Sequence, residues 1–393
     1  MSAAPAPEVR SVFRPTSDPA TFRSLGQVEG FDGIRGVSIL LVVFVHLRLI
    51  EYGGPTHVKL FDSFFEGGFL GVDLFMVLSG FLITAVLLRE HISTGRVRLR
   101  TFYLRRAVRL LPALTALLIA HAVYATISRY SPAVTSNPLA ANWEIIANEL
   151  HLIFFTAIYL SNFYLKFRAL AYPPDMGHLW SLAVEEQFYL LWPVLLVALV
   201  QVRSGLRFAK WLLVVAIVAV SVRRITLFGQ VNWVELSVRT DTRVDPLLLG
   251  ALLALLWSQH RTPTRHLNKA AWIAVAVMAV MVYTAAADTE GATWMGSVFS
   301  IGAAVLVLAT VEQQWTALRV LRHGVLDRLG KISYGLYLWH PPIFVFMGRE
   351  ASTMPTFPRI VLAIALSLGI SLLSYHLLEQ PLQRRFRRRL AGC

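Results

Sequence analysis

Residues 31–50 read FDGIRGVSILLVVFVHLRLI, and the class of the fold follows from this stretch. It holds the run of about 20 mainly apolar residues that an α-helix needs to cross the hydrocarbon core of a bilayer. This first run spans 33–50, and ten more follow along the chain, at residues 68–89, 107–127, 146–165, 182–200, 209–227, 244–258, 270–287, 294–311, 332–348 and 358–378. The sequence therefore predicts an all-α, polytopic bundle of transmembrane helices.

The composition of the whole chain agrees with a membrane protein. Of its 393 residues, 56% are hydrophobic and only 15% are charged, whereas soluble proteins carry roughly 25% charged residues. These figures exclude a disordered chain, and the single cysteine, Cys393, excludes a disulfide scaffold. The net charge of +14 does not indicate a nucleic-acid partner, because the basic residues lie in short loops beside the apolar runs.

The charges in the loops decide whether segment 146–165 crosses the membrane. If it crossed, the basic loops at 203–210, 261–269 and 319–331 would face the outside. If it does not cross, all of them face the cytoplasm, as the positive-inside rule requires. We therefore predict about ten transmembrane helices with both termini cytoplasmic, and a segment 146–165 that is re-entrant or interfacial on the outer side.

The predicted organisation has one membrane domain and two tails. Residues 1–28 are rich in Pro, Ser and Ala, and we expect a disordered cytoplasmic tail. Residues 29–382 form the membrane domain, and residues 383–393 form a basic cytoplasmic tail.

Arg35 and His46 are ionisable groups inside the first apolar run. They are eleven positions apart, which on a helix is about 16 Å, and both side chains fall on nearly one face. Ionisable groups within spans are expensive and commonly functional. A neutral imidazole is a natural general base near pH 7. The structural alternative for His46 is an interior histidine bonded to a backbone carbonyl.

The stretch HLWSLAVEEQFYLLWP at 178–193 carries a second set of polar groups. His178, Ser181 and Glu185 share one helix face. A buried carboxylate needs a partner, and two alternatives fit Glu185 equally. It could orient His46 and raise its basicity, or it could form a structural ion pair, for instance with Arg243.

The stretch TFYLRRAVRLLPAL at 101–114 carries an arginine cluster. Positive-inside anchoring accounts for Arg105 or Arg106, but Arg109 lies one turn deeper. Guanidinium groups bind phosphates through paired donors, so the cluster suits a polyphosphate ligand at the inner mouth of a cavity.

Further polar residues sit at the ends of other runs, and each also has a structural explanation. Asp73 could cap a helix or pair with a buried cation, and Ser79 is typical of close helix packing. Tyr337 could belong to an interfacial belt. We expect no metal site, because the sequence has neither an HExxH motif nor a cysteine cluster.

Taken together, these motifs resemble the acyltransferase-3 family of integral membrane O-acyltransferases over about residues 29–385. The resemblance rests on the spacing of Arg35 and His46 and on the order of the stretches GVDLFMVLSGFLIT, RRAVRLLP, HLWSLAVEEQFYLLWP, RVDPLLLG, YGLYLWHPPI and YHLLEQPL. The chain departs mildly from the family pattern at Met76, where Phe is common, and at Pro246.

The resemblance implies an enzyme of the bacterial inner membrane that moves an acyl group, often acetyl, from acyl-coenzyme A to a hydroxyl. The acceptor would be a carbohydrate of the cell envelope, a glycolipid or a macrolide. His46 and Glu185 would be catalytic, and the donor would bind Arg35, Arg105, Arg106 and Arg109. The remaining candidates for substrate binding are Asp73, Ser79, Ser181, Arg243, Asp245 and Tyr337. Some members carry a C-terminal esterase-like domain, and we expect none here because few residues follow Pro381.

Two questions stay open from the sequence. His46 either deprotonates the acceptor hydroxyl or receives the acyl group itself as an acyl-imidazole. From the residues alone, a transporter or flippase for a glycan or lipid is an equally good interpretation, since intramembrane charges suit both. The resemblance favours the enzyme, and release of free coenzyme A thiol would separate the two.

Overall fold

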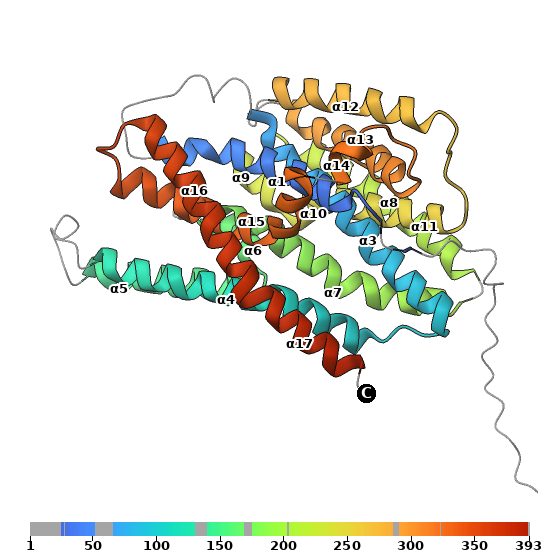
Figure 1. The fold of residues 1–393 in the computed structure, drawn as a ribbon, viewed down its shortest axis with the longest axis horizontal. Coiled ribbons are helices and arrows are strands. Elements are labelled where there is room, and N and C mark those ends of the chain that lie inside the picture. Colours follow the sequence, from blue (N-terminus) through green and yellow to red (C-terminus); the bar gives the residue numbers. More distant parts are fainter. Residues whose placement is uncertain are drawn as a thin grey trace, which may run out of the picture.

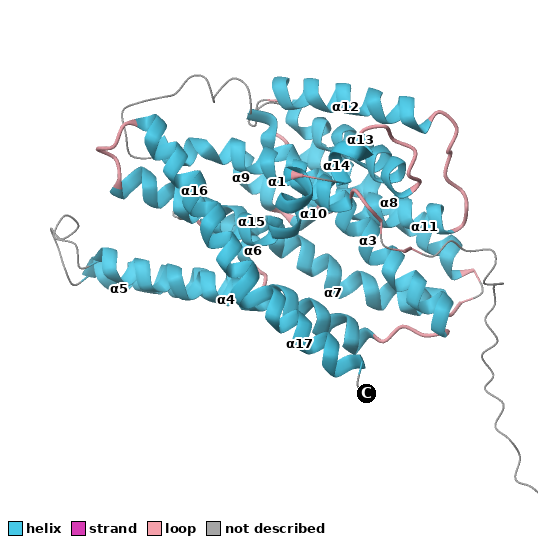
Figure 2. Cartoon of the chain, in the orientation of Figure 1, coloured by secondary structure: helices cyan, strands magenta, loops and turns pink. Residues whose placement is uncertain are grey.

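The computed structural model describes residues 25–26, 28–51, 66–129, 140–168, 175–202, 204–285, 291–322 and 324–391. These residues form helices and connecting loops, with no strand among them (Figure 2). The predicted all-α fold is confirmed. Cys393 and the predicted N-terminal tail, apart from residues 25, 26 and 28, lie outside the described ranges.

Eight helical segments in the described part of the chain are long and apolar enough to cross a membrane. They are built from α1 (Phe31–His46) with η2 (Leu47–Glu51), η3 (Glu66–Leu70) with α3 (Gly71–Thr94), α4 (Leu99–Arg129), η5 (Gly177–Leu179) with α7 (Trp180–Val200), α8 (Gly205–Leu227), α12 (Leu267–Thr284), α13 (Gly291–Val311), and α16 (Thr356–Ser374) continued by η6 (Tyr375–Glu379) and α17 (Gln380–Ala391).

The structure thus gives eight candidate spans among the described residues against the predicted total of about ten, and two further helices fall short of the length or the apolarity of a span. Helix α11 (Asp245–Ser258) is apolar but has only 14 residues. Helix α15 (Val325–Glu350) has 26 residues and contains Pro341 and Pro342 as well as several polar side chains. Its interior position explains this polarity, since α15 packs between α1 and α16 (Figure 1). The side of the membrane on which each terminus lies stays a prediction.

The hairpin of α5 (Ala140–Ala157) and α6 (Ser161–Arg168) agrees with a segment that does not cross. Helices α4 and α7 run antiparallel, because Tyr103 contacts Leu190 while Arg106, further along α4, contacts the earlier residue Glu186. The end of α4 and the start of α7 therefore face the same side of the bundle. The α5–α6 hairpin, which connects them, begins and ends on that side, and α5 lies along α4 (Figure 1).

Glycines allow the central helices to approach backbone to backbone. A Cβ added at Gly36 of α1 would overlap the carbonyl oxygen of Leu326 of α15, and one at Gly330 of α15 would overlap the carbonyl oxygen of Asp32. Between membrane helices, where lipid tails are as apolar as leucine, such close packing is a main source of association. The α1–α15 pair is therefore fixed by residues that cannot carry a side chain.

We predict that Gly36→Ala destabilises the bundle. The added methyl group meets the backbone of α15, which cannot rotate away, and overpacking of this kind costs about 1–3 kcal/mol. The expected result is a lower folded yield and a lower unfolding temperature in detergent.

Gly369→Ala in α16 is the matched control, because no atom lies within 4 Å of an added Cβ there. Both substitutions place alanine in a helix, where it is favoured over glycine. Equal unfolding temperatures for the two variants would contradict the close α1–α15 contact.

Candidate active site

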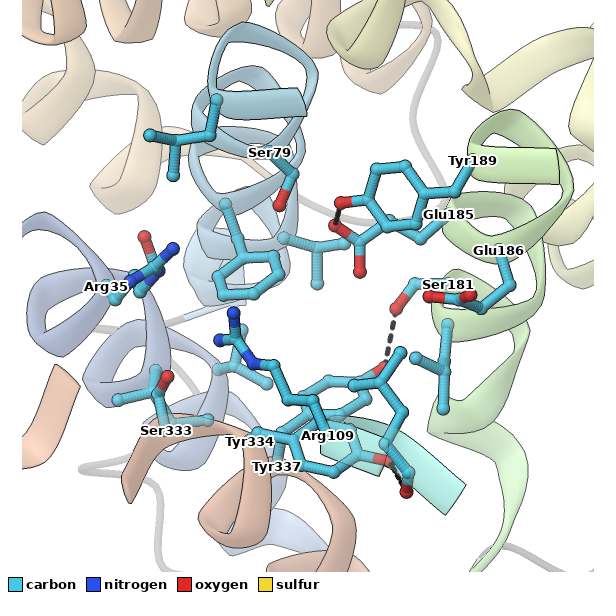
Figure 3. A pocket seen from close by; sticks show the side chains of 18 of the residues that line it. Arg35, Ser79, Arg109, Ser181, Glu185, Glu186, Tyr189, Ser333, Tyr334 and Tyr337 are labelled. Atoms are coloured by element: carbon cyan, nitrogen blue, oxygen red, sulfur yellow. Dashed lines mark hydrogen bonds between the residues drawn. The ribbon is translucent and has the colours of Figure 1, made fainter. Parts of the chain in front are cut away.

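A cavity of about 900 Å³ lies among α1, α3, α4, α7 and α15, partly open to solvent (Figure 3). Helix α1 contributes Arg35, Ser38, Ile39 and Val42, which repeat at helical spacing and so form one face. The other polar lining residues are Ser79, Arg106, Arg109, Ser181, Glu185, Glu186, Tyr189, Ser333, Tyr334 and Tyr337.

The arginines of the cavity differ in whether they have a partner. Arg35 pairs with Asp32 at 2.7 Å. Arg106 pairs with Glu186 at 2.5 Å and lies over the ring of Tyr189, 3.4 Å from its centroid.

Arg109 is the exception among them. Its guanidinium points into the middle of the cavity and makes no hydrogen bond or ion pair with the described residues (Figure 3). The carboxylate of Glu379 attracts this guanidinium electrostatically, and the positive charge of Arg35 repels it. Glu379 is nevertheless not close enough to form an ion pair with it. Arg109 thus stands free to bind an anionic group.

Arg105 does not belong to the cavity. The sequence grouped it with Arg106 and Arg109, but its side chain is exposed on the outside of α4. The helical period explains the correction: residues three apart share a face, whereas adjacent residues point about 100° apart.

Glu185 lines the cavity, but it forms neither of the pairs expected for it. Its carboxylate accepts a hydrogen bond of 2.6 Å from the hydroxyl of Tyr189, and the side chain of Ser79 is near enough to interact with it electrostatically. The predicted contact with His46 is therefore wrong, and Arg243 pairs elsewhere. Depth in the membrane placed Glu185 and His46 at a similar level, but it could not show which way each helix is turned.

His46 lies one turn beyond Val42, at the end of the cavity face of α1, and is not itself among the lining residues. Its Nδ1 is 3.1 Å from Nε2 of His340, and its ring centroid is 6.4 Å from that of His178. His340 and His178 are buried, whereas His46 is only half-buried. His46 is thus the accessible member of a cluster of three histidines. No group of three His, Cys, Asp or Glu side chains in the described residues is arranged to hold a metal ion.

Tyr337 links the cavity to the histidine cluster. Its hydroxyl donates a hydrogen bond to the carbonyl oxygen of His178. Ser181 must then be the donor in the 2.6 Å contact between its hydroxyl and that of Tyr337. The ring of Tyr337 also packs against that of His178, with centroids 5.1 Å apart. Ser181 and Tyr337 are therefore part of the cavity wall, and Tyr337 is not a belt residue at the interface.

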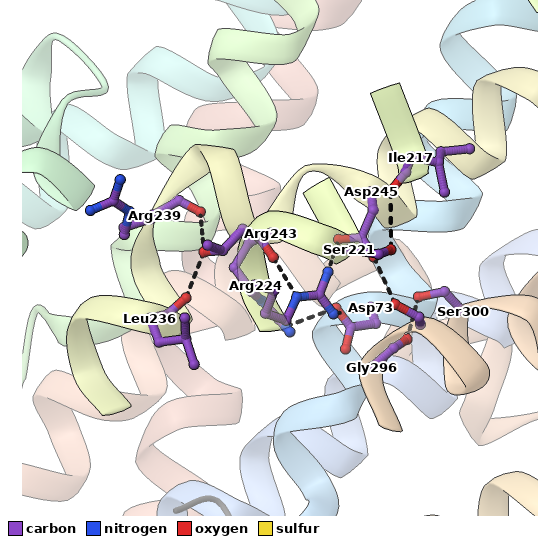
Figure 4. Close-up of polar contacts among 12 residues, drawn as sticks. Asp73, Ile217, Ser221, Arg224, Leu236, Arg239, Arg243, Asp245, Gly296 and Ser300 are labelled. Carbon is purple, nitrogen blue, oxygen red and sulfur yellow. Dashed lines mark hydrogen bonds and ion pairs between the residues drawn. The ribbon is translucent and has the colours of Figure 1, made fainter. Parts of the chain in front are cut away.

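Asp73, Arg243 and Asp245, predicted to bind substrate, lie in a separate network (Figure 4). Arg243 binds Asp73 at 2.8 Å, and Arg224 binds Asp245. All four side chains are buried, and none lines the cavity. The network joins α3, α8, α11 and α10 (Thr240–Arg243), so the structure places these residues where they hold helices together.

Several residues of the site were not identified from the sequence. Glu186 had no assigned role, yet it is the partner of Arg106. His340 carried no role, although a histidine inside an apolar run gives the same signal as His46. Arg224, which pairs with Asp245 in the separate network, was also not identified from the sequence.

A family model for an acyltransferase domain matches residues 28–376. The chain belongs to the acyltransferase-3 family. The resemblance inferred from the ordered motifs is thereby confirmed. No solved structure matches this member of the family.

Relatives of this acyltransferase-3 family member include two named bacterial proteins. "Peptidoglycan O-acetyltransferase OatA" of Listeria monocytogenes is 29% identical over 384 residues, which cover 91% of this chain and 56% of the relative. "Putative peptidoglycan O-acetyltransferase YrhL" of Bacillus subtilis is 29% identical over 391 residues, which cover 92% of this chain and 56% of the relative. The chain thus spans little more than half the length of these relatives.

We predict that Asp73→Asn impairs folding rather than ligand binding. The substitution leaves Arg243 as a buried charge without its ion-pair partner, which costs about 3–5 kcal/mol. The expected result is a loss of monodisperse protein in size-exclusion chromatography.

Asp241→Asn is the control. The Asp241 side chain is 47% exposed, and its hydrogen bond from Arg239 keeps the pKa of this carboxyl below its usual value. Exposed pairs contribute about 0–1 kcal/mol, so this variant should behave like the unmodified chain. An Asp73→Asn protein as stable as Asp241→Asn would return Asp73 to the substrate-binding candidates.

Proposed function

We propose that the chain is a membrane O-acyltransferase that moves an acyl group, acetyl in the first instance, from acyl-coenzyme A to a hydroxyl of a cell-envelope carbohydrate. The observation that carries this proposal is the guanidinium of Arg109, unpaired among the described residues, in a cavity whose α1 face ends at Val42, one turn before His46. Family membership and the names of the relatives support the same reaction.

The donor site is proposed at the arginine end of the cavity. A cation within the membrane that lacks a carboxylate partner indicates an anionic ligand, and coenzyme A carries several phosphate charges. Arg109 would bind one phosphate directly through its planar set of donors. Arg35 and Arg106 already hold carboxylates, so their part is to add positive potential around Arg109.

The route from donor to histidine follows one face of α1. Arg35, Ser38, Ile39 and Val42 line the cavity in succession, and His46 is on the next turn. The rise of a helix puts Arg35 and His46 about 16 Å apart. With its phosphates at Arg109, the extended pantetheine arm would point its thioester toward Val42, Tyr337 and His46.

His46 would act through an unprotonated ring nitrogen. In the direct route it takes the proton of the acceptor hydroxyl, whose oxygen attacks the thioester carbonyl and expels coenzyme A as the thiol. In the two-step route the nitrogen itself attacks the thioester carbonyl and expels coenzyme A as the thiol. The acyl-imidazole then passes the acyl group to the acceptor hydroxyl. Both routes require an accessible histidine, and His46 is the accessible member of its cluster.

Glu185 is proposed as a positioning residue rather than the partner of His46. It fixes the hydroxyl of Tyr189, whose ring lies under the guanidinium of Arg106. Through Tyr189, the Glu185 carboxylate therefore shapes the α7 wall of the donor site. The bacterial inner membrane is the proposed location, since the described part of the chain has eight candidate spans and the chain has bacterial relatives.

The proposal predicts release of free coenzyme A thiol from acetyl-coenzyme A by the purified protein in lipid, in the presence of a cell-envelope glycan extract. His46→Ala should lower the rate at least about 100-fold, because it removes the base or nucleophile. Equal release by His46→Ala and the unmodified protein would sink the proposed role of His46. A folded protein that releases no thiol from acetyl- or longer acyl-coenzyme A with the extract would favour the transporter interpretation.

Arg109→Ala should raise the KM for acetyl-coenzyme A with a smaller effect on kcat. Loss of a hydrogen bond to a charged group predicts a change of about 10-fold to 100-fold. Arg100→Ala is the control, because Arg100 is an exposed arginine on the same helix outside the cavity. A KM that rises equally in both variants would show only a general loss of positive charge and would contradict the phosphate site.

A further inference from the structure

We propose that His340 is a positioning residue that fixes the tautomer of His46, so that the neutral His46 ring always presents an unprotonated Nε2. The inference rests on the proposed role of His46 and adds a residue to which the acyl-transfer scheme gives no part. It follows from two hydrogen bonds and from the fact that a carbonyl oxygen can only accept.

The first hydrogen bond fixes the tautomer of His340. Its Nδ1 is 2.7 Å from the carbonyl oxygen of Leu336, one turn earlier on α15. Because the carbonyl has no proton to give, Nδ1 must carry one. In a neutral imidazole the other nitrogen, Nε2, is then an acceptor.

The second hydrogen bond passes this assignment on to His46. Nε2 of His340 lies 3.1 Å from Nδ1 of His46, so Nδ1 of His46 must donate the proton of that contact. The carbonyl of Val42, one turn earlier on α1, also lies beside the His46 ring and can likewise only accept. The lone pair of neutral His46 is therefore left on Nε2, which is the nitrogen that a base or a nucleophile needs.

Burial makes the assignment rigid. His340 is 0% exposed and packs against the ring of Phe344, with centroids 5.6 Å apart. A flipped tautomer of His340 would place a proton against His46 and would set the lone pair of Nδ1 against the Leu336 carbonyl oxygen. In a buried site an unmade hydrogen bond is costly, so one proton arrangement is strongly preferred.

The other side chains around His46 cannot replace His340. His178 faces the ring from η5, but neither of its ring nitrogens makes a hydrogen bond with the described residues. Arg48 on η2 acts on His46 through its positive charge and offers no acceptor. Among these neighbours, His340 alone has an acceptor within hydrogen-bond distance of Nδ1.

Two substitutions separate the contributions of the two hydrogen bonds that the His340 ring makes, at Nδ1 and at Nε2. In His340→Asn the amide nitrogen can take the place of Nδ1 and keep the bond to Leu336, but the side chain is too short to reach His46. In His340→Gln the longer amide can present its oxygen near the position of Nε2 and accept from His46. His340→Phe fills the volume and provides neither group.

The activity test measures thiol release by the three variants at equal amounts of folded protein. We expect kcat to fall about 10-fold to 100-fold in His340→Phe and His340→Asn, with the KM for acetyl-coenzyme A changed less than about twofold. His340→Gln should recover much of the loss. Recovery by His340→Asn but not by His340→Gln would show that His340 only closes its own helix turn, and would overturn the proposal.

The spectroscopic test does not depend on activity. Nitrogen NMR of protein labelled at histidine, recorded at a pH where the rings are neutral, identifies His46 by the signals lost in His46→Gln. The proposal expects protonated Nδ1 and unprotonated Nε2 in the unmodified chain, and a mixture of tautomers in His340→Phe. A protonated Nε2 on His46 in the unmodified chain would overturn it. If the unmodified chain shows the expected tautomer but releases no thiol, the proposed function fails while the tautomer assignment stands.

Discussion

The close contact between α1 and α15 positions the histidine pair on which the proposed acyl transfer depends. The two helices meet through backbone atoms at Gly36 and Gly330, where a side chain would not fit. This contact brings His46 of α1 within hydrogen-bond distance of His340 of α15. A hydrogen bond of 3.1 Å between two histidines nearly 300 residues apart in the chain is possible only because the helix axes are held this near.

The bilayer imposes a second constraint, since it offers no water to a buried polar group. Buried charged groups occur in two separate places in this chain. The network of Asp73, Arg243, Asp245 and Arg224 pairs each charge and joins four helices. In the cavity, by contrast, Arg109 has no such partner among the residues that the structure describes. The difference between the two places is what distinguishes a structural network from a site that can receive a charged ligand.

Much of this arrangement could be predicted from the sequence, because it depends on patterns within one helix. The apolar runs gave the positions of the spans, and the eleven-residue spacing placed Arg35 and His46 on one face. The mismatch between Arg109 and simple positive-inside anchoring also pointed to the cavity, since Arg109 lies one turn deeper than its neighbours. In each case the helical period, or depth along the helix, carries the information.

The rest depends on how the helices are rotated about their axes, and a single sequence does not record that rotation. Depth alone paired His46 with Glu185, whereas the actual partner of His46 comes from α15 and that of Glu185 from its own helix. The same limit made Asp73 and Arg243 look like substrate ligands when they bind each other. Arg105 was included only because it is adjacent in sequence to a residue that does face the cavity.

The most direct test of the account is a structure of the protein in lipid with a non-hydrolysable acetyl-coenzyme A analogue bound. We expect a phosphate of the analogue on the guanidinium of Arg109, with the pantetheine arm extended along α1. The acyl carbon should lie about 3–3.5 Å from the attacking atom, which is either Nε2 of His46 or a hydroxyl oxygen activated by it. An analogue bound outside the cavity, or with its acyl group directed away from His46, would contradict the account.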